Sequence, residues 1–146
     1  ISPNTHPGWQ IAFDPHNADR VVVVVPDSAD SNKGTARIGT LNGTTISWAA
    51  ASQYDVSGES LNNMVAFNPR VVDQVIVGYN SITTNLNGVV VGTISSTNTI
   101  SFGSQFWESG IVFVMGFFSG VSFVFFSSES IFFIFLENSL FFSKTF

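Results

Sequence analysis

The chain contains the stretch Ile11-Ala12-Phe13-Asp14-Pro15, followed by Arg20-Val21-Val22-Val23-Val24-Val25. A second copy begins Val65-Ala66-Phe67-Asn68-Pro69 and continues Gln74-Val75-Ile76-Val77-Gly78-Tyr79. The copies are offset by 54 residues, with a slip to 53 at Gly39 and Gly92, and each ends in Thr-Ile-Ser plus an aromatic residue. Self-similarity at a period of about 50 residues is typical of propellers, solenoids and arrays. We therefore expect a tandem repeat protein.

Each copy predicts four short β-strands joined by turns. Runs of β-branched residues form the strands, Pro15 and Pro26 end two of them, and Asn42-Gly43 is a strong hairpin turn. The expected strands are 10–13, 20–25, 34–41 and 44–48, then 64–67, 74–79, 88–94 and 98–102. The sequence thus predicts an all-β protein of four-stranded antiparallel units that resemble β-propeller blades. A linear array or a sandwich of the same units is the alternative architecture.

Residues 111–146 differ sharply in composition, because they hold 12 of the 16 phenylalanines. Their rhythm predicts a degenerate third unit with strands at 111–114, 121–126, 131–136 and 140–142. Two alternatives are an uncharged membrane helix at 110–128 and a poorly determined tail. The many Ser and Gly and the lack of flanking Lys or Arg argue against the helix. The expected division is an entry segment at 1–9 and units at 10–60, 61–110 and 111–146.

Charge and cysteine content narrow the classes of function. The net charge is −5 with only five Lys and Arg, so no basic stripe is present to follow a nucleic-acid backbone. Charged residues make up 10% of the chain, well below the roughly 25% of an ordinary soluble domain. The absence of cysteine excludes disulfides and thiolate metal sites. Such a polar but uncharged composition is common in extracellular β-proteins.

The repeated residues also carry a resemblance to a known group of proteins. The pattern is carried by Phe13-Asp14-Pro15, Gly39-Thr40, Thr45-Ile46-Ser47-Trp48, Phe67-Asn68-Pro69, Gly92-Thr93 and Thr99-Ile100-Ser101-Phe102-Gly103. It resembles the tandem repeats, about 50 residues long, of secreted proteins from sponges and other marine invertebrates and of bacterial and phage surface proteins. The resemblance covers about residues 9–106. It implies a β-propeller-like fold, with adhesion or glycan binding as the expected role.

The polar residues do not predict a catalytic or metal centre. His6 and His16 are the only histidines, and no nucleophile elbow accompanies them. Asp14 and Asp19 correspond to Asn68 and Asp73 in the second copy. Because these short polar residues recur with the repeat, they indicate turn formers rather than paired catalytic acids. Asp27, Asp30 and Asn32 lack the spacing of a calcium loop. We therefore expect no enzyme, metal or cofactor, with a propeller glycoside hydrolase as a third hypothesis.

Aromatic residues beside short polar ones predict a sugar site. An exposed aromatic face packs on the C–H side of a sugar ring, and neighbouring amides and carboxylates bind its hydroxyls. We also expect Trp48, the counterpart of Phe102, to lie in the core. The candidate ligand-binding residues are Asp27, Asp30, Asn32, Tyr54, Tyr79, Asn80, Asn85 and Trp107.

These observations favour a non-enzymatic, secreted, lectin-like protein that binds glycans through repeated loops. The alternative is a structural or fibre-forming extracellular subunit. Asn42 begins the single Asn-x-Ser/Thr motif and is a candidate for glycosylation. At most three units cannot close a propeller of about four to eight blades, so homo-oligomers or further repeats are expected. No nucleic acid partner is expected, and the sequence argues against a membrane.

Overall fold

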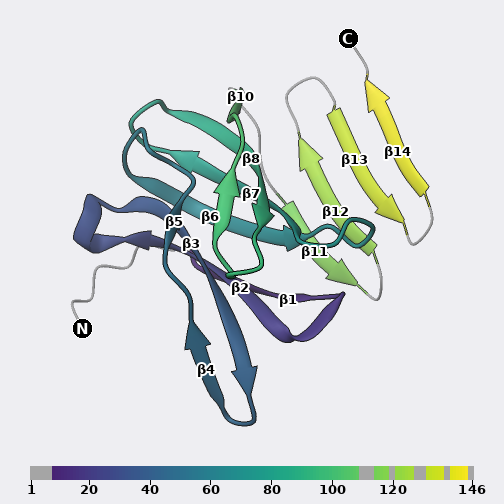
Figure 1. Cartoon of the computed structure of the whole chain (residues 1–146). Helices are drawn as coiled ribbons and strands as arrows, with labels where there is room; N and C mark the ends of the chain where they lie inside the picture. Colours follow the sequence, from purple (N-terminus) through teal and green to yellow (C-terminus); the bar gives the residue numbers. More distant parts are fainter. Residues whose placement is uncertain (1–7, 109–113, 119–120, 127–130, 137–138, 145–146) are drawn as a thin grey trace. The chain divides into compact units, whose positions relative to one another are not determined.

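The computed structural model describes residues 8–108, 114–118, 121–126, 131–136 and 139–144, with side chains described for residues 8–107 (Figure 1). The predicted all-β, antiparallel architecture is confirmed for these residues. The one described helix is η1 (Ser28–Asp30), a single 3₁₀ turn, and no described helix is long and apolar enough to span a lipid bilayer. The described sheets do not close into a propeller ring.

The two sequence copies form two sheets with the same strand order. The first sheet contains β1 (Gln10–Asp14), β2 (Asn17–Asp27), β3 (Lys33–Asn42) and β4 (Thr45–Trp48), and β5 (Ser52–Gln53) also pairs with β3. The second sheet contains β6 (Ser60–Phe67), β7 (Gln74–Ser81), β8 (Leu86–Ile94) and β9 (Ile100–Phe102), and β10 (Phe106–Glu108) also pairs with β8. Each sheet therefore has a fifth, short strand that the sequence did not predict.

Strand pairing follows the sequence repeat residue by residue. Phe13 lies opposite Val21 in the first sheet, and its counterpart Phe67 lies opposite Val75 in the second. Likewise Gly39 faces Trp48, and Gly92 faces Phe102. The hairpin between β3 and β4 turns at Gly43 and Thr44, one residue later than expected. Gly43 has a φ of 60°, which a glycine adopts without steric cost.

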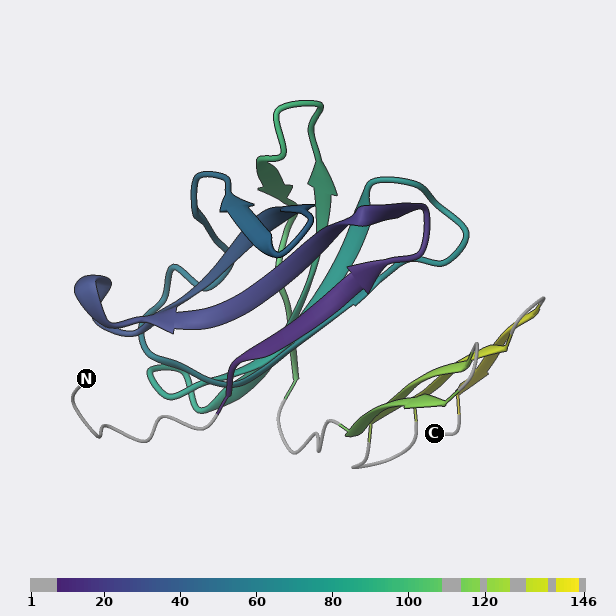
Figure 2. The ribbon, with the colours of Figure 1, turned by 90° about the horizontal axis from the view of Figure 1, so that it is seen from below.

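The two sheets pack face on face and share one core. Figure 2 shows β1 and β2 lying over the teal strands of the second sheet. The alternation of side chains along each strand sends one set from each sheet into this layer. The first sheet contributes Ala12, Val22, Val24, Ala36 and Ile38, and the second contributes Val65, Phe67, Val75, Val77, Tyr79, Val90, Ile94 and Ile100. A stack of two sheets therefore agrees with the alternative architecture.

The Phe-rich part of the chain forms a separate compact unit. Its strands β11 (Val114–Phe118), β12 (Val121–Phe126), β13 (Ile131–Leu136) and β14 (Ser139–Lys144) form a sheet in which each strand pairs with the next. The bounds of β12 and β13 are those predicted, whereas β11 and β14 differ from the expected 111–114 and 140–142. The alternative of a helix at 110–128 is wrong for the described residues, which are strands there. Residues 111–113 of the predicted first strand lie outside the described residues.

Candidate functional site

The two hairpin loops predicted to bind ligand lie at the same end of the stacked sheets. The backbone N–H of Ser60 donates to the carbonyl of Asn32 at 2.9 Å, and that of Ile82 donates to the carbonyl of Glu59 at 2.9 Å. The segment at 59–60 therefore runs between loop 27–33 and loop 80–87. The repeat brings its equivalent loops together here, as a multivalent binding end requires.

The polar side chains at this end bind mainly one another. The Asp27 carboxylate accepts from the Ala29 N–H at 3.0 Å and caps η1, and Asn80 donates to Asn87 at 3.1 Å. Asp30 lies 3.2 Å from the Lys33 ammonium and accepts from Gln53; these two contacts lower its pKa. Among the described residues, no three His, Asp or Glu side chains gather as a metal site would need.

Two further predicted residues serve the backbone of this end. Asn32 and Asn85 have φ values of 57° and 54°, in the left-handed region that asparagine tolerates better than most residues. The loop backbone therefore favours asparagine at these two positions, whether or not their side chains also bind a ligand as predicted. The loops offer polar atoms to a ligand but no exposed aromatic ring.

The predicted aromatic platform is absent, because its tyrosines are buried. Tyr54 is 2% exposed and Tyr79 is 0% exposed, so the expectation that they stack on a sugar is wrong. Each ring is accommodated by a glycine: a Cβ added at Gly88 would lie 2.5 Å from the Tyr79 ring, and one at Gly34 would overlap the Tyr54 ring. Trp107 is half-buried, with its ring edge-on to Tyr79 at 5.7 Å between centroids.

The tyrosines enclose a buried polar cluster that sequence reasoning missed. Asp55 is fully buried, and one of its oxygens accepts from the Ser57 N–H at 2.9 Å. Its other oxygen and the Tyr79 hydroxyl have no hydrogen-bond partner among the described residues. Burial, and to a smaller extent the nearby Asp55 carboxylate, raises the pKa of both Tyr54 and Tyr79 above the ordinary value.

This burial predicts a steep alkaline transition. Tyr54 and Tyr79 are the only tyrosines of the chain, and both are expected to stay neutral in the folded protein above pH 10. In the unfolded chain they ionise near pH 10, so the stability from their neutral forms is complete below pH 10 and declines above it. The decline is at most about 1.4 kcal/mol per pH unit for each tyrosine. Tyrosinate absorbance and circular dichroism, followed together from pH 9 to 13, should change in one step. A tyrosinate signal that appears before unfolding would contradict the prediction that both tyrosines stay neutral in the folded protein.

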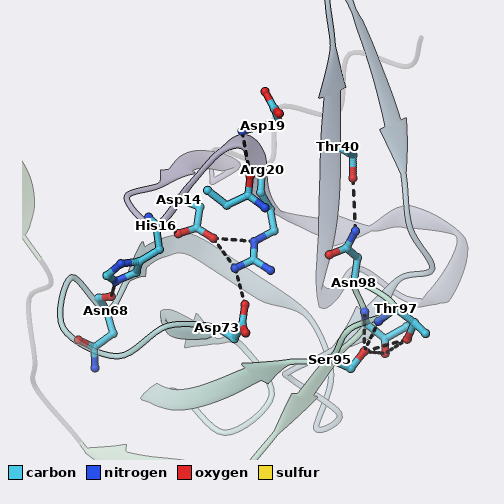
Figure 3. Close-up of polar contacts among 12 residues, drawn as sticks. Asp14, His16, Asp19, Arg20, Thr40, Asn68, Asp73, Ser95, Thr97 and Asn98 are labelled. Carbon is cyan, nitrogen blue, oxygen red and sulfur yellow. Dashed lines mark hydrogen bonds and ion pairs between the residues drawn. The ribbon is translucent and has the colours of Figure 1, made fainter.

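An ion cluster joins the two sheets at the opposite end of β2; Asp14 and Arg20 are buried, whereas the Asp73 side chain is exposed (Figure 3). The Arg20 guanidinium lies 2.5 Å from Asp14 in its own sheet and 2.5 Å from Asp73 in the second. Burial alone would lower the pKa of Arg20, but hydrogen bonds to Asp73 and Asp14 outweigh it and raise the pKa. His16 adds a 3.2 Å contact between its Nε2 and the Asn68 carbonyl, so this histidine has a structural partner.

The outward surface of the first sheet exposes large apolar side chains. We call it the outer face, and it comprises the exposed Ile11, Phe13, Ile46 and Trp48, the half-buried Val23 and the buried Gly39. The Ile46, Trp48 and Val21 side chains lie against Gly39, and Val21 is itself covered. Ile11 and Ile46 are each 40% exposed, Phe13 is 67% exposed, and Trp48 is 44% exposed. The expectation that Trp48 lies in the core is therefore wrong, because no described strand covers this face.

The repeat offset maps the outer face onto a surface that is buried. Its counterparts in the second sheet are Val65, Phe67, Val77, Gly92, Ile100 and Phe102. All of these lie against the first sheet: five are buried and Phe102 is partly buried. The chain therefore carries two versions of one packing surface, and one version is open to solvent. This outer face is the candidate functional site.

The expected glycosylation residue, Asn42, is exposed where β3 ends. Its backbone carbonyl accepts from the Thr45 hydroxyl at 2.9 Å. The side chain thus lies on an accessible hairpin, and glycosylation there stays a prediction.

Comparison of the chain with models of protein families, with curated proteins and with solved structures finds no match. The resemblance to secreted tandem repeats therefore stays a prediction.

Proposed function

We propose that this protein is a non-enzymatic structural subunit of an extracellular assembly, held together by stacking of β-sheets. The observation that carries the proposal is the outer face, an exposed copy of a surface that the same chain buries in its own core. Exposed contiguous aromatic and aliphatic side chains mark interaction surfaces. Units that stack face on face, as the two sheets of this chain do, would use this surface to add a further sheet.

One residue of the first sheet, Arg37, is expected to weaken the stacking of a further sheet. Arg37 is exposed on β3, where the second sheet has the buried Val90. A guanidinium at this position must be desolvated when a sheet covers it, which costs free energy. Charged residues that interrupt an exposed apolar surface also favour solubility. The subunits are therefore expected to associate reversibly rather than to precipitate.

Glycan binding is the second candidate, and one observation favours it. Loops 27–33 and 80–87 lie at one end of the stacked sheets, as a repeated binding surface needs. The geometry supports stacking better, because Tyr54 and Tyr79 are buried and several of the loop side chains are engaged with each other. Sugars that compete with self-association would reverse this ranking.

The proposal predicts that Phe13→Ser combined with Trp48→Ser abolishes self-association. These side chains are exposed in the single chain, so their removal costs the fold little, whereas an interface would lose its aromatic anchors. Sedimentation velocity across micromolar concentrations should show larger species for the wild type and a 15.8 kDa monomer for the double variant. The matched control is Val56→Ser with Ile82→Ser, two exposed residues outside the outer face. A monomeric wild type would overturn the proposal.

A further inference from the structure

The two sheets of this chain stack in a head-to-tail manner. Phe67 and its neighbours point toward the first sheet, whereas their counterparts around Phe13 point away from the second. Opposite faces of equivalent units thus meet in the interface. Two units related by a twofold axis would instead bury the same face. A contact between opposite faces does not close on itself, so it can be repeated by a further unit.

The polar contacts of the interface follow the same direction. Arg20 of the first sheet reaches Asp73 of the second, and in the repeat Asp73 corresponds to Asp19. Asp19 is exposed at the start of β2, and Figure 3 shows it near Arg20. The first sheet therefore has, in Asp19, the counterpart of the carboxylate that in the second sheet accepts the Arg20 donor. In this structure it faces solvent.

The second sheet carries the matching donor in a neutral form. Asn68 and Gln74 replace Asp14 and Arg20, and the Asn68 amide donates to the Gln74 side-chain oxygen at 2.6 Å. The Gln74 amide nitrogen keeps its own N–H groups, as the Arg20 guanidinium does where it binds Asp73. Arg70, the exposed counterpart of His16, adds positive charge to the same edge.

We propose that a second copy of this chain docks its second sheet onto the outer face, with Gln74 of that copy donating to Asp19. This inference rests on the proposed function and names the partner surface for it. Ala66, Ile76 and Val91 of the arriving copy take the places that Ala12, Val22 and Ile38 occupy in the internal interface. Because the contact joins opposite faces, copies add in one direction and form open-ended stacks.

A charge exchange tests this pairing in the intact chain. Gln74→Glu places a carboxylate against Asp19, and Asp19→Lys places a cation against Arg70 of the next copy. Each single variant should weaken self-association by about tenfold, the size of a lost hydrogen bond to a charged group. The double variant Asp19→Lys with Gln74→Glu restores opposite charges and should associate at least as tightly as the wild type. Sedimentation equilibrium of all four proteins measures the effect, and circular dichroism checks that each one is folded.

Two outcomes separate this inference from the proposed function. In the first, the wild type associates, the variant with Phe13→Ser and Trp48→Ser does not, and the charge exchange has no effect. The inferred partner surface is then wrong, but stacking through the outer face is supported. In the second, neither the wild type nor any variant associates, and both the proposed function and the inferred partner surface are wrong. Cysteine crosslinking gives an independent reading, because the natural chain has no cysteine. Asp19→Cys chains should crosslink to Gln74→Cys chains and not to one another.

The matched crosslinking control is Ser28→Cys. Ser28 is exposed beyond the far end of β2, about 30 Å from Asp19 at about 3.3 Å per strand residue. It should not crosslink to Gln74→Cys chains. Crosslinks between two Asp19→Cys chains would indicate a symmetric dimer and overturn the proposal.

Discussion

Replacement of Arg20 with methionine is expected to destabilise the stacked sheets by about 3–5 kcal/mol. The Asp14 side chain is 0% exposed, and Arg20 is its cationic partner at 2.5 Å. Methionine fills much of the same volume but leaves a carboxylate buried without a counter-ion, and this costs more than the ion pair contributes. The loss also removes the contact with Asp73, which joins the two sheets. Urea unfolding followed by circular dichroism measures the change in the free energy of unfolding.

The second repeat supplies the matched control for this experiment. Asn68 and Gln74 occupy the equivalent positions with a neutral hydrogen bond of 2.6 Å. The double variant Asp14→Asn with Arg20→Gln copies that pair into the first sheet, so no charge is left buried. It should recover most of the stability that the single variant loses. A double variant as unstable as Arg20→Met would show that the charge of Asp14 is not the cause.

The strands could be predicted from sequence because their signals are local. The Val-rich run at 21–25, Pro15 and the repeated Thr-Ile-Ser segments predict the type and order of the strands in both sheets. The expectation that Pro26 ends its strand is wrong, because β2 continues to Asp27 and Pro26 lies opposite Gly34. The repeat then aligns the pairing, which is why Phe13 and Phe67 have equivalent partners in their sheets. The short strands β5 and β10 were missed because two or three residues carry no periodic pattern.

The candidate site could not be predicted because burial is not a local property. Tyr54 and Tyr79 stand beside polar residues in the sequence, yet glycines at 34 and 88 open space for both rings in the interior. Trp48 and Phe102 have the same sequence context, and only the stacking direction exposes the first more than the second. Asp14 forms the expected turn, because its carboxylate accepts from the His16 N–H at 2.8 Å, but Asp14 and Asp73 also both bind Arg20, which their sequence context does not indicate. Long-range packing decided each of these cases.

Phe67→Ala is expected to cost about 3–5 kcal/mol, whereas Phe13→Ala should cost less than about 1 kcal/mol. The two residues are repeat counterparts with the same strand pairing, but Phe67 is 5% exposed and Phe13 is 67% exposed. Removal of the Phe67 ring leaves a cavity in the shared core, while removal of the Phe13 ring leaves one only where another sheet covers it. Urea unfolding of dilute protein compares the two variants directly. Equal losses would contradict the opposite orientation of the two faces.

Protein concentration extends this comparison to the assembly. Association stabilises the folded chain by mass action. The free energy that a residue in the interface contributes to stability therefore rises with protein concentration. The cost of Phe13→Ala should therefore increase with concentration toward that of Phe67→Ala, whose cost is set within one chain. This convergence follows only if the outer face becomes buried in the same way as its counterpart around Phe67. A Phe13→Ala cost that stays small and constant up to concentrations at which the wild type associates would place the contact elsewhere on the molecule.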